Sequence, residues 1–178
     1  MQVSEPTPTP PEQYTSAVQQ RVYRLLTDLK IPYQRVDCTP AITMEDCQLI
    51  SQRLNNPVIK TLLLTNRQKT AFYLLVMPPN KPFITKDFGA ALNISRVSFA
   101  PADLLLSMLG TPVGAASLLS LCMDEDNRVQ LVIDQAAIQT ESYSCSDTTT
   151  TSYIKLPTQA LLTTYLNAIH HNYITINL

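Results

Sequence analysis

The stretch Val58-Ile59-Lys60-Thr61-Leu62-Leu63-Leu64-Thr65 decides how the rest of the chain is interpreted. Its length and branched apolar residues predict a largely buried β-strand. Alternation along a strand places Lys60 on the same face as Leu62 and Leu64, so an ammonium group leaves an otherwise apolar surface. Either this lysine reaches solvent at the strand end, or it points into a cavity that requires a cation.

The composition indicates one globular domain. The chain has 178 residues, of which 45% are hydrophobic and 15% are charged. No apolar run approaches the ~20 residues of a membrane span, so we expect no membrane association. The N-terminus lacks the basic start and apolar core of a signal peptide, and we therefore expect a cytoplasmic protein.

The cysteines and histidines do not form a metal or nucleophile motif, so we predict no metal and no cofactor. The adjacent His170 and His171 are expected at the surface near a helix end. The four cysteines lack the short paired spacing of zinc or dithiol sites and are predicted to be reduced and mostly packed: Cys38, Cys47, Cys122 and Cys145.

Basic residues are concentrated in one part of the chain. Between Arg53 and Arg96, seven lysines and arginines accompany a single acid, whereas residues 97–178 contain two basic residues and seven acids. This distribution is compatible with a positive face for nucleic acid and equally with scattered, solvated lysines. The slightly acidic isoelectric point argues against strong nonspecific binding, and DNA is not expected as a partner.

The pattern along the chain predicts an α+β fold: a single domain with a mixed, largely antiparallel curved sheet surrounded by helices. The proline-rich residues 1–15 should form a flexible or polyproline arm, and residues 16–178 the domain. Helices are predicted over 16–30, 43–54 (with Thr43 as the cap), 85–92, 101–109 and 157–170. Strands are predicted over 33–37, 58–66, 71–77 and 95–100, with hairpins at 58–77 and 118–133 and a strand and turn within 142–153.

A loop of small residues, Gly110-Thr111-Pro112-Val113-Gly114-Ala115-Ala116-Ser117, follows the fourth predicted helix. It holds two of the three glycines of the chain. We expect a backbone position there that turns tightly or lets another group approach closely, although plain turn glycines fit equally well.

Four segments of this chain, in this order, resemble the YbaK/prolyl-tRNA editing family, whose members hydrolyse wrongly charged aminoacyl-tRNAs. The resemblance runs from about Val22 to Ile169. The segments and the family patterns they resemble are Thr39–Glu45 (H-P-x-x-T-x-E), Val58–Leu64 (the lysine strand), Arg96–Ala100 with Leu109–Ser117 (R-x-S-F-A and L-G-x-x-P-G-x-x-S-P), and Ser144–Thr151 (H-P-N-D-N-T-A-T).

The resemblance implies a deacylase that removes a small amino acid from a mischarged tRNA, with prolyl-tRNA as a candidate. It implies the 3′ end of aminoacyl-tRNA as the partner and an aminoacyl-tRNA synthetase as a further one. Lys60 would anchor the 3′ end, and the Gly114–Ser117 loop would stabilise the oxyanion formed by water attack. Implied catalytic residues are Lys60, Gly114 and Ala115; implied substrate-binding residues are Thr43, Thr61, Ser98, Ala116, Ser117, Ser144, Asp147 and Thr149.

The chain departs from the family pattern where Ser144, Cys145 and Ser146 replace histidine, proline and asparagine. These departures motivate a second hypothesis, a catalytically lapsed member that binds an aminoacyl or nucleotide ligand or a protein partner. A third is hydrolysis of another small acyl ester. Structural explanations also stay open: an exposed strand for the Thr148–Thr151 run, and a turn cap for Asp147.

Overall fold

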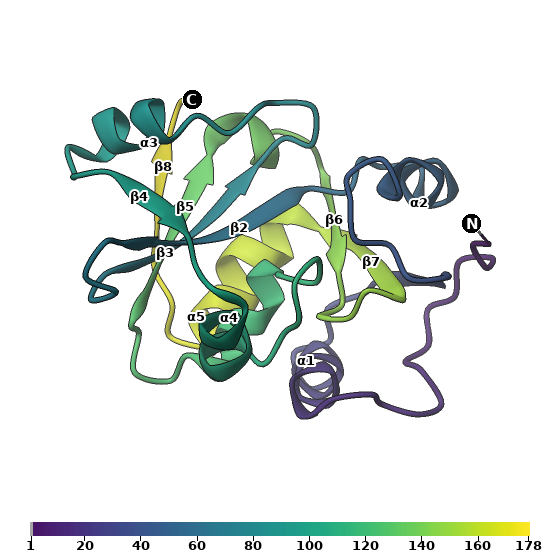
Figure 1. The fold of residues 1–178 in the computed structure, drawn as a ribbon. Helices are drawn as coiled ribbons and strands as arrows, with labels where there is room; N and C mark the ends of the chain where they lie inside the picture. The colour runs from purple at the N-terminus through teal and green to yellow at the C-terminus, as the bar shows by residue number, and fades with distance from the viewer. Residues whose placement is uncertain (1) are drawn as a thin grey trace.

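The computed structural model describes residues 2–178 and contains two β-sheets flanked by helices (Figure 1). The larger sheet has the order β4-β2-β3-β5-β8, in which β2 pairs antiparallel with β3 and β4 while β5 pairs parallel with β3 and β8. The smaller sheet, β1-β7-β6, is antiparallel. The strands are β1 (Gln34–Asp37), β2 (Lys60–Asn66), β3 (Phe72–Met77), β4 (Val97–Phe99), β5 (Val129–Asp134), β6 (Ser142–Ser146), β7 (Ser152–Pro157) and β8 (Tyr173–Ile176).

Helices cover both sheets, and the predicted α+β class is confirmed. Ser16 caps the first helix by accepting a hydrogen bond from the Gln19 amide, and the apolar face of that helix lies in the core. The helical elements are α1 (Ala17–Asp28), α2 (Cys47–Leu54), α3 (Thr85–Leu92), α4 (Ala102–Leu109), η1 (Leu118–Met123), η2 (Gln135–Ile138), η3 (Ala160–Tyr165) and α5 (Leu166–Ala168).

The two sheets meet where β2 begins. Val58 forms a parallel bridge with Ser144 of β6, and the Ile59 amide donates to the Ser144 carbonyl at 2.8 Å. The predicted hairpin of β2 and β3 is confirmed by a continuous register from Lys60–Met77 to Thr65–Phe72. The start of β2 is therefore held by backbone pairing to both sheets.

The predicted hairpin over 118–133 is wrong. Residues 118–123 form the 3₁₀ helix η1, and β5 pairs parallel with β3 instead of with its own upstream neighbour. The Ser117 side chain caps η1, and the Asp124 carboxylate accepts the amides of Arg128 and Val129 and so turns the chain into β5. A short apolar run that is buried all round carries no period that separates strand from helix.

The C-terminal prediction needs two corrections. Pro157 ends β7, the following helix contains the π-helical segment η3, and a last strand, β8, had not been predicted. His171 is not at the surface: it is only 4% exposed, and its Nε2 lies 3.1 Å from the Asp124 carbonyl oxygen. Three of the four β8 residues are exposed, and β8 lies at the edge of the sheet; the alternation in Ile174-Thr175-Ile176 was a strand signal that the prediction did not use.

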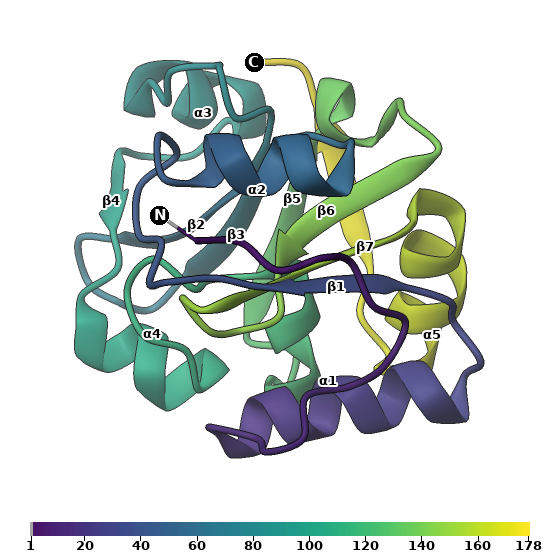
Figure 2. The same cartoon turned by 90° about the vertical axis from the view of Figure 1, so that its right-hand side faces the viewer.

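The segment predicted as a flexible arm lies along β1 (Figure 2). Thr7 and Arg35 exchange two backbone hydrogen bonds of 2.7 and 2.8 Å, and Val3 bridges to Cys38. Arg35 also donates from Nε to the Thr9 carbonyl. Because β1 is the edge of the smaller sheet, it offers unpaired backbone groups that this segment covers.

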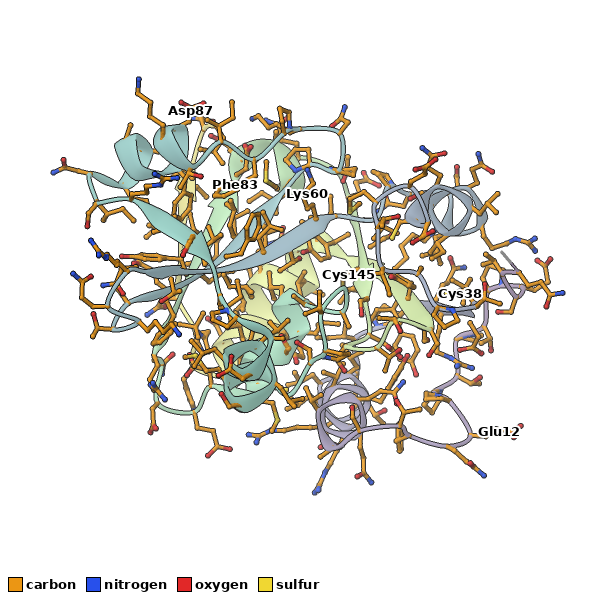
Figure 3. All side chains as sticks on the ribbon, viewed as in Figure 1. Glu12, Cys38, Lys60, Phe83, Asp87 and Cys145 are labelled. Atoms are coloured by element: carbon orange, nitrogen blue, oxygen red, sulfur yellow. The ribbon has the colours of Figure 1, made fainter. Side chains whose placement is uncertain are left out.

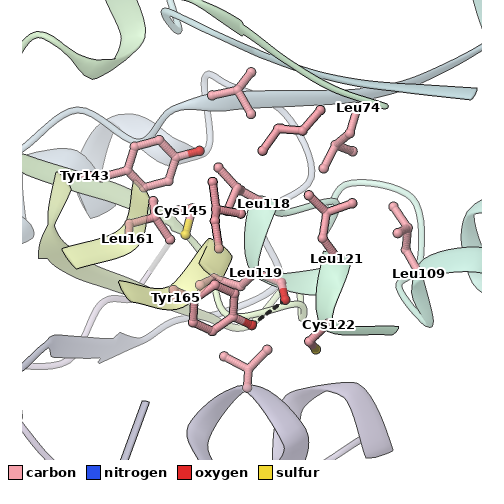
Figure 4. Close-up of a cluster of buried hydrophobic side chains, with 14 of the residues drawn as sticks. Leu74, Leu109, Leu118, Leu119, Leu121, Cys122, Tyr143, Cys145, Leu161 and Tyr165 are labelled. Atoms are coloured by element: carbon pink, nitrogen blue, oxygen red, sulfur yellow. Dashed lines mark hydrogen bonds between the residues drawn. The ribbon is translucent and has the colours of Figure 1, made fainter. Parts of the chain in front are cut away.

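The main core packs η1, β6 and η3 together (Figure 4). Tyr165 and Tyr143 are both buried in it, with 0% and 1% of their surfaces exposed. The Tyr165 hydroxyl donates to the Leu119 carbonyl at 2.7 Å, whereas within residues 2–178 the Tyr143 hydroxyl faces the Thr61 hydroxyl without forming a hydrogen bond of normal geometry to it or to any other group. The two rings are thus equally buried, but they differ in whether the hydroxyl group makes a hydrogen bond.

This difference predicts opposite effects of the same substitution. Tyr165→Phe leaves the Leu119 carbonyl without its donor and should lower the free energy of unfolding by about 1 kcal/mol. Tyr143→Phe removes an unsatisfied buried hydroxyl and should be neutral or stabilising. Urea unfolding of both variants measures this; equal losses would contradict the assignment of the two hydroxyls.

Candidate functional site

Lys60 lies at the start of β2 and its side chain is half-buried (Figure 3). Its Nζ donates to the Lys81 carbonyl at 2.5 Å, and the Lys81 ammonium in turn pairs with the buried Asp134 carboxylate at 2.7 Å. The loop that contains Lys81 is thereby fastened to β5. Loss of hydration lowers the pKa of Lys60. The lysine therefore neither extends freely into solvent nor lies deep in a cavity; a loop carbonyl receives it.

Gly114 is the position of close approach that the sequence predicted. Its φ is +87°, a left-handed conformation, and a Cβ there would lie 2.9 Å from Ile42 Cγ2 and 3.1 Å from Ile42 Cα. Gly110, at φ +69°, ends helix α4 with its amide donating to Leu106. A Cβ at Gly110 would lie 3.3 Å from Val18, so the more severe clash, at 2.9 Å, is the one at Gly114.

The inner side of the loop is closed. Ala115 and Ser117 have no exposed surface, and the Ala115 amide donates to the Pro112 carbonyl at 3.1 Å. The implied role of Ala115 as an oxyanion donor is therefore not supported by its geometry, because its N–H is already used. Within residues 2–178, the amides of Gly114 and Ala116 have no hydrogen-bond acceptor, and Gly114 is exposed.

Strand β6 connects this loop to β2. Ser144 is fully buried, and its Oγ accepts from Asn56 Nδ2 at 2.8 Å. The Thr61 hydroxyl is buried without a hydrogen-bond partner in the described part of the chain. Asn56 was not predicted as a site residue, since Asn55-Asn56-Pro57 had only indicated a helix end.

Asp147 and Thr149 lie in the turn after β6, where the Asp147 side chain faces α1. The Asp147 carboxylate accepts from Gln19 Nε2 at 2.8 Å, Tyr23 OH at 2.9 Å and Thr149 Oγ1 at 2.8 Å. It also accepts a hydrogen bond from the Thr149 amide, as expected if this aspartate caps a turn. Burial raises the pKa of Asp147 despite these donors. Both residues thus join α1 to the β6–β7 turn.

The threonine run is a turn, and the prediction of an exposed strand there is wrong. Thr148 adopts φ +88°, and Thr148 and Thr149 are 1% and 7% exposed. The Ser146 hydroxyl donates to the Thr149 carbonyl at 2.6 Å and accepts the Thr148 amide. Local side-chain hydrogen bonds to the backbone outweigh the β propensity of threonine here.

The two remaining predicted residues lie on the surface. Thr43 was predicted to cap the second helix, but α2 begins at Cys47 with Asp46 as its N-cap; Thr43 and Asp46 instead exchange reciprocal hydrogen bonds in the turn before it, and Thr43 follows Ile42 at the rim of the Gly114 loop. Ser98 is exposed on β4, opposite Thr65.

The structure groups the predicted site residues into separate places. Alternation along β2 directs Lys60 to the face of Leu62 and Leu64, which pack in one core cluster, while the η1 end of the loop packs with Leu63 in another. Lys60 and the loop are thus on opposite sides of β2. The loop side holds Gly114, Ala115, Ala116, Ser117 and Ser144, with Thr61 in the same face of β2.

No group of three or more His, Cys, Asp or Glu side chains within residues 2–178 could hold a metal ion. The four cysteines are free thiols. In the same part of the chain, no helix has the length and apolarity to span a bilayer.

Residues 38–164 match the sequence profile of the aminoacyl-tRNA editing domain, so the chain belongs to this family. Among curated proteins, the prolyl-tRNA editing protein ProX of Acetoanaerobium sticklandii is 28% identical over 116 residues, which is 65% of this chain and 71% of ProX.

Solved structures with this fold include the hypothetical protein APE2540, with a TM-score of 0.67, 15% identity and coverage of 88% of this chain and 98% of that one. Another, provisionally described as a trans-editing enzyme for prolyl tRNA synthetase, has a TM-score of 0.66, 10% identity and coverage of 93% and 99%. At these identities the likeness concerns the fold.

The raised pKa of Asp147 predicts a pH dependence of stability. Its native pKa lies above the unfolded value of about 3.9, so its contribution to the free energy of unfolding falls as pH rises from about 4 through the native pKa. The difference between the unaltered protein and Asp147→Asn should shrink or reverse over this window in urea unfolding.

Asp46→Asn is the matched control. Hydrogen bonds from Thr43 and Ile42 lower the pKa of Asp46, so its stabilising contribution is present above the unfolded pKa and is lost as pH falls through the native one. The corresponding difference should grow with rising pH. The same sign of slope for both variants would contradict the assignment.

Proposed function

We propose that this protein is a trans-editing hydrolase that deacylates mischarged aminoacyl-tRNA carrying a small amino acid. The observation that carries the proposal is the exposed Gly114, whose amide has no acceptor in the described chain, in a loop that lies inside the family match. The relative ProX is a prolyl-tRNA editing protein, which supports prolyl-tRNA as the tRNA to test first.

The proposed reaction is hydrolysis of the ester between the amino acid and a ribose hydroxyl. Water attacks the carbonyl carbon, and the tetrahedral oxyanion accepts hydrogen bonds from the amides of Gly114 and Ala116. The bond from carbon to the ribose oxygen then breaks, and that oxygen receives the proton lost by water. Removal of one such donor typically costs ~3 kcal/mol of transition-state stabilisation.

Water is a better nucleophile here than a thiol of the protein. Burial raises the pKa of the Cys145 thiol to about 12 and raises that of Cys122 as well, so neither is ionised near neutrality. The buried His171 is held by Asp124. We therefore assign proton removal from water to the amino group or ribose hydroxyl of the substrate.

We assign to Lys60 the role of binding a phosphate at the RNA 3′ end. Its ammonium lies on the face of β2 opposite the loop, so it is poorly placed to reach an ester oxygen held by Gly114. The Lys60 ammonium donates to the Lys81 carbonyl and still has N–H donors left, so it can also bind an anion that approaches from the side of the loop around Lys81. Anchoring a phosphate is compatible with this position.

We assign the selection of the amino acid by size to the small residues of the loop. Of the small loop residues after Gly114, Ala116 is partly exposed while Ala115 and Ser117 are buried, and the exposed Ile42 and Val113 form an apolar rim at Gly114. A site of this kind discriminates by excluding larger side chains, as the second sieve of an editing enzyme does.

The alternative is a lapsed family member that binds an aminoacyl or nucleotide ligand or a protein partner. It is favoured by the complete burial of Ser144, which stands where the family pattern has histidine, and by the occupied Ala115 amide. A panel of mischarged tRNAs, including prolyl-tRNA bearing a wrong amino acid, separates the two. Release of amino acid from any member excludes a binding-only role, and release from none contradicts deacylation.

Gly114→Ala should lower kcat for deacylation by about 10²- to 10³-fold, because the strained backbone and the clash with Ile42 displace an oxyanion donor. Gly110→Ala is the control, since it places a side chain at the same kind of backbone angle, 3.3 Å from Val18 and outside the proposed site. Single-turnover kinetics measures both. An equal loss for both glycines would assign the effect to folding.

Lys60→Gln should raise KM for aminoacyl-tRNA with little change in kcat, because it removes a contact that substrate and transition state share. Lys30→Gln, at an exposed lysine after α1, should change neither constant. A fall in kcat at unchanged KM would instead place Lys60 at the reacting ester.

A further inference from the structure

A basic and aromatic surface surrounds strand β4, which forms an edge of the five-stranded sheet (Figure 1). One cavity of about 540 Å³ has Arg67, Lys69, Arg96 and Phe99 in its wall. A second, of about 580 Å³, contains Lys86 and shares Arg96 with the first. We call these five residues the β4 surface.

The positive charge of the β4 surface is not held in salt bridges. Within residues 2–178, none of its four cationic side chains forms a salt bridge; Asp87, beside Lys86 on α3, is an exposed acid next to them. Four cations without salt bridges around two cavities that share Arg96 favour an extended anionic partner.

Phe99 provides a flat apolar face among these charges. It is 61% exposed, and its ring lies 5.6 Å from that of Phe83, which lies 6.0 Å from the buried Phe88. The ring is therefore supported from behind and open in front. Aromatic rings beside basic side chains are the arrangement by which proteins hold unpaired nucleotides, with bases stacked and phosphates bound.

The β4 surface continues to Lys60. Phe83 follows two residues after Lys81, whose carbonyl accepts the Lys60 ammonium, and it packs against the core cluster that includes Leu62 and Leu64 on the Lys60 face of β2. A strand of RNA whose terminal phosphate lies at Lys60 would thus find the ring of Phe99 and the cations of the β4 surface along one path.

We propose that the β4 surface binds the unpaired 3′ strand of the tRNA, with a base stacked on Phe99 and phosphates held by Arg67, Lys69 and Arg96. This proposal rests on the proposed function, since it names the part of the substrate that extends beyond the ester. A duplex would hide its bases from Phe99, so the single strand is the occupant that uses both the ring and the charges.

The test measures binding of a short fluorescent single-stranded RNA ending in CCA, by anisotropy at several salt concentrations. For Arg67→Gln/Arg96→Gln, the slope of log Kobs against log salt concentration should become shallower by about 1.4, because two single-strand phosphate contacts are lost. Phe99→Ala should weaken binding at least about fivefold, and Phe99→Trp should retain it.

The matched control is Arg24→Gln/Lys30→Gln, which removes two exposed cations on or just after α1 and should leave slope and affinity unchanged. An unchanged slope in the test variant, or an equal change in the control, would overturn the proposal and leave the surface to an acidic protein partner.

Hydrolysis of an aminoacyl ester of adenosine by the unaltered protein is followed in parallel. Absence of hydrolysis counts against the proposed function alone, while loss of the RNA effects counts against the β4 surface alone.

Discussion

The backbone hydrogen bond from Ile59 to Ser144 joins the two sheets, and the arrangement of the candidate site depends on it. It fixes the start of β2 against β6, so the next residue, Lys60, can point to one side only. The same pairing buries Ser144 and holds β6 close enough for Ser146 to approach the Ala115 carbonyl. One strand junction thus determines where both the lysine and the glycine loop lie.

Much of the fold was predictable because its signals are local. The stripe of α1 and the hairpin of β2 and β3 each follow from a few neighbouring residues, whereas the need for glycine at 114 depends on Ile42, which is remote in sequence. The parallel pairing of β5 with β3 does not follow from neighbouring residues either, since it depends on η1 being a helix, and an apolar run of six residues carries no period that decides this. His171 was misplaced for a related reason: its burial depends on Asp124, which is remote in sequence.

The candidate site was predicted less well than the fold because side-chain direction depends on distant contacts. Alternation correctly placed Lys60 on the face of Leu62 and Leu64, but the group that receives its ammonium, the Lys81 carbonyl, lies in a proline-rich loop with no signal of its own. Asp147 matches a family position, yet in this chain Gln19 and Tyr23 hold it. A residue that matches a family motif, such as Asp147, can therefore hold α1 in place and need not bind a ligand.

The separation of Lys60 from the Gly114 loop constrains how an aminoacyl-tRNA could be bound. If both groups act on one substrate, the terminal nucleotide must cross the start of β2, with its ester at Gly114 and its phosphate toward Lys81. The path from that phosphate then leads over Phe83 to Phe99, since these rings adjoin the same loop. If the reaction at the Gly114 loop needs no cation, the role of Lys60 is to hold the separate loop around Lys81 in place through its hydrogen bond to the Lys81 carbonyl. The two roles of Lys60 predict a different dependence on the length of the RNA. If Lys60 binds a phosphate, its charge matters more for a substrate with phosphates than for an aminoacyl ester of adenosine; if it only holds the loop around Lys81, the charge matters equally for both.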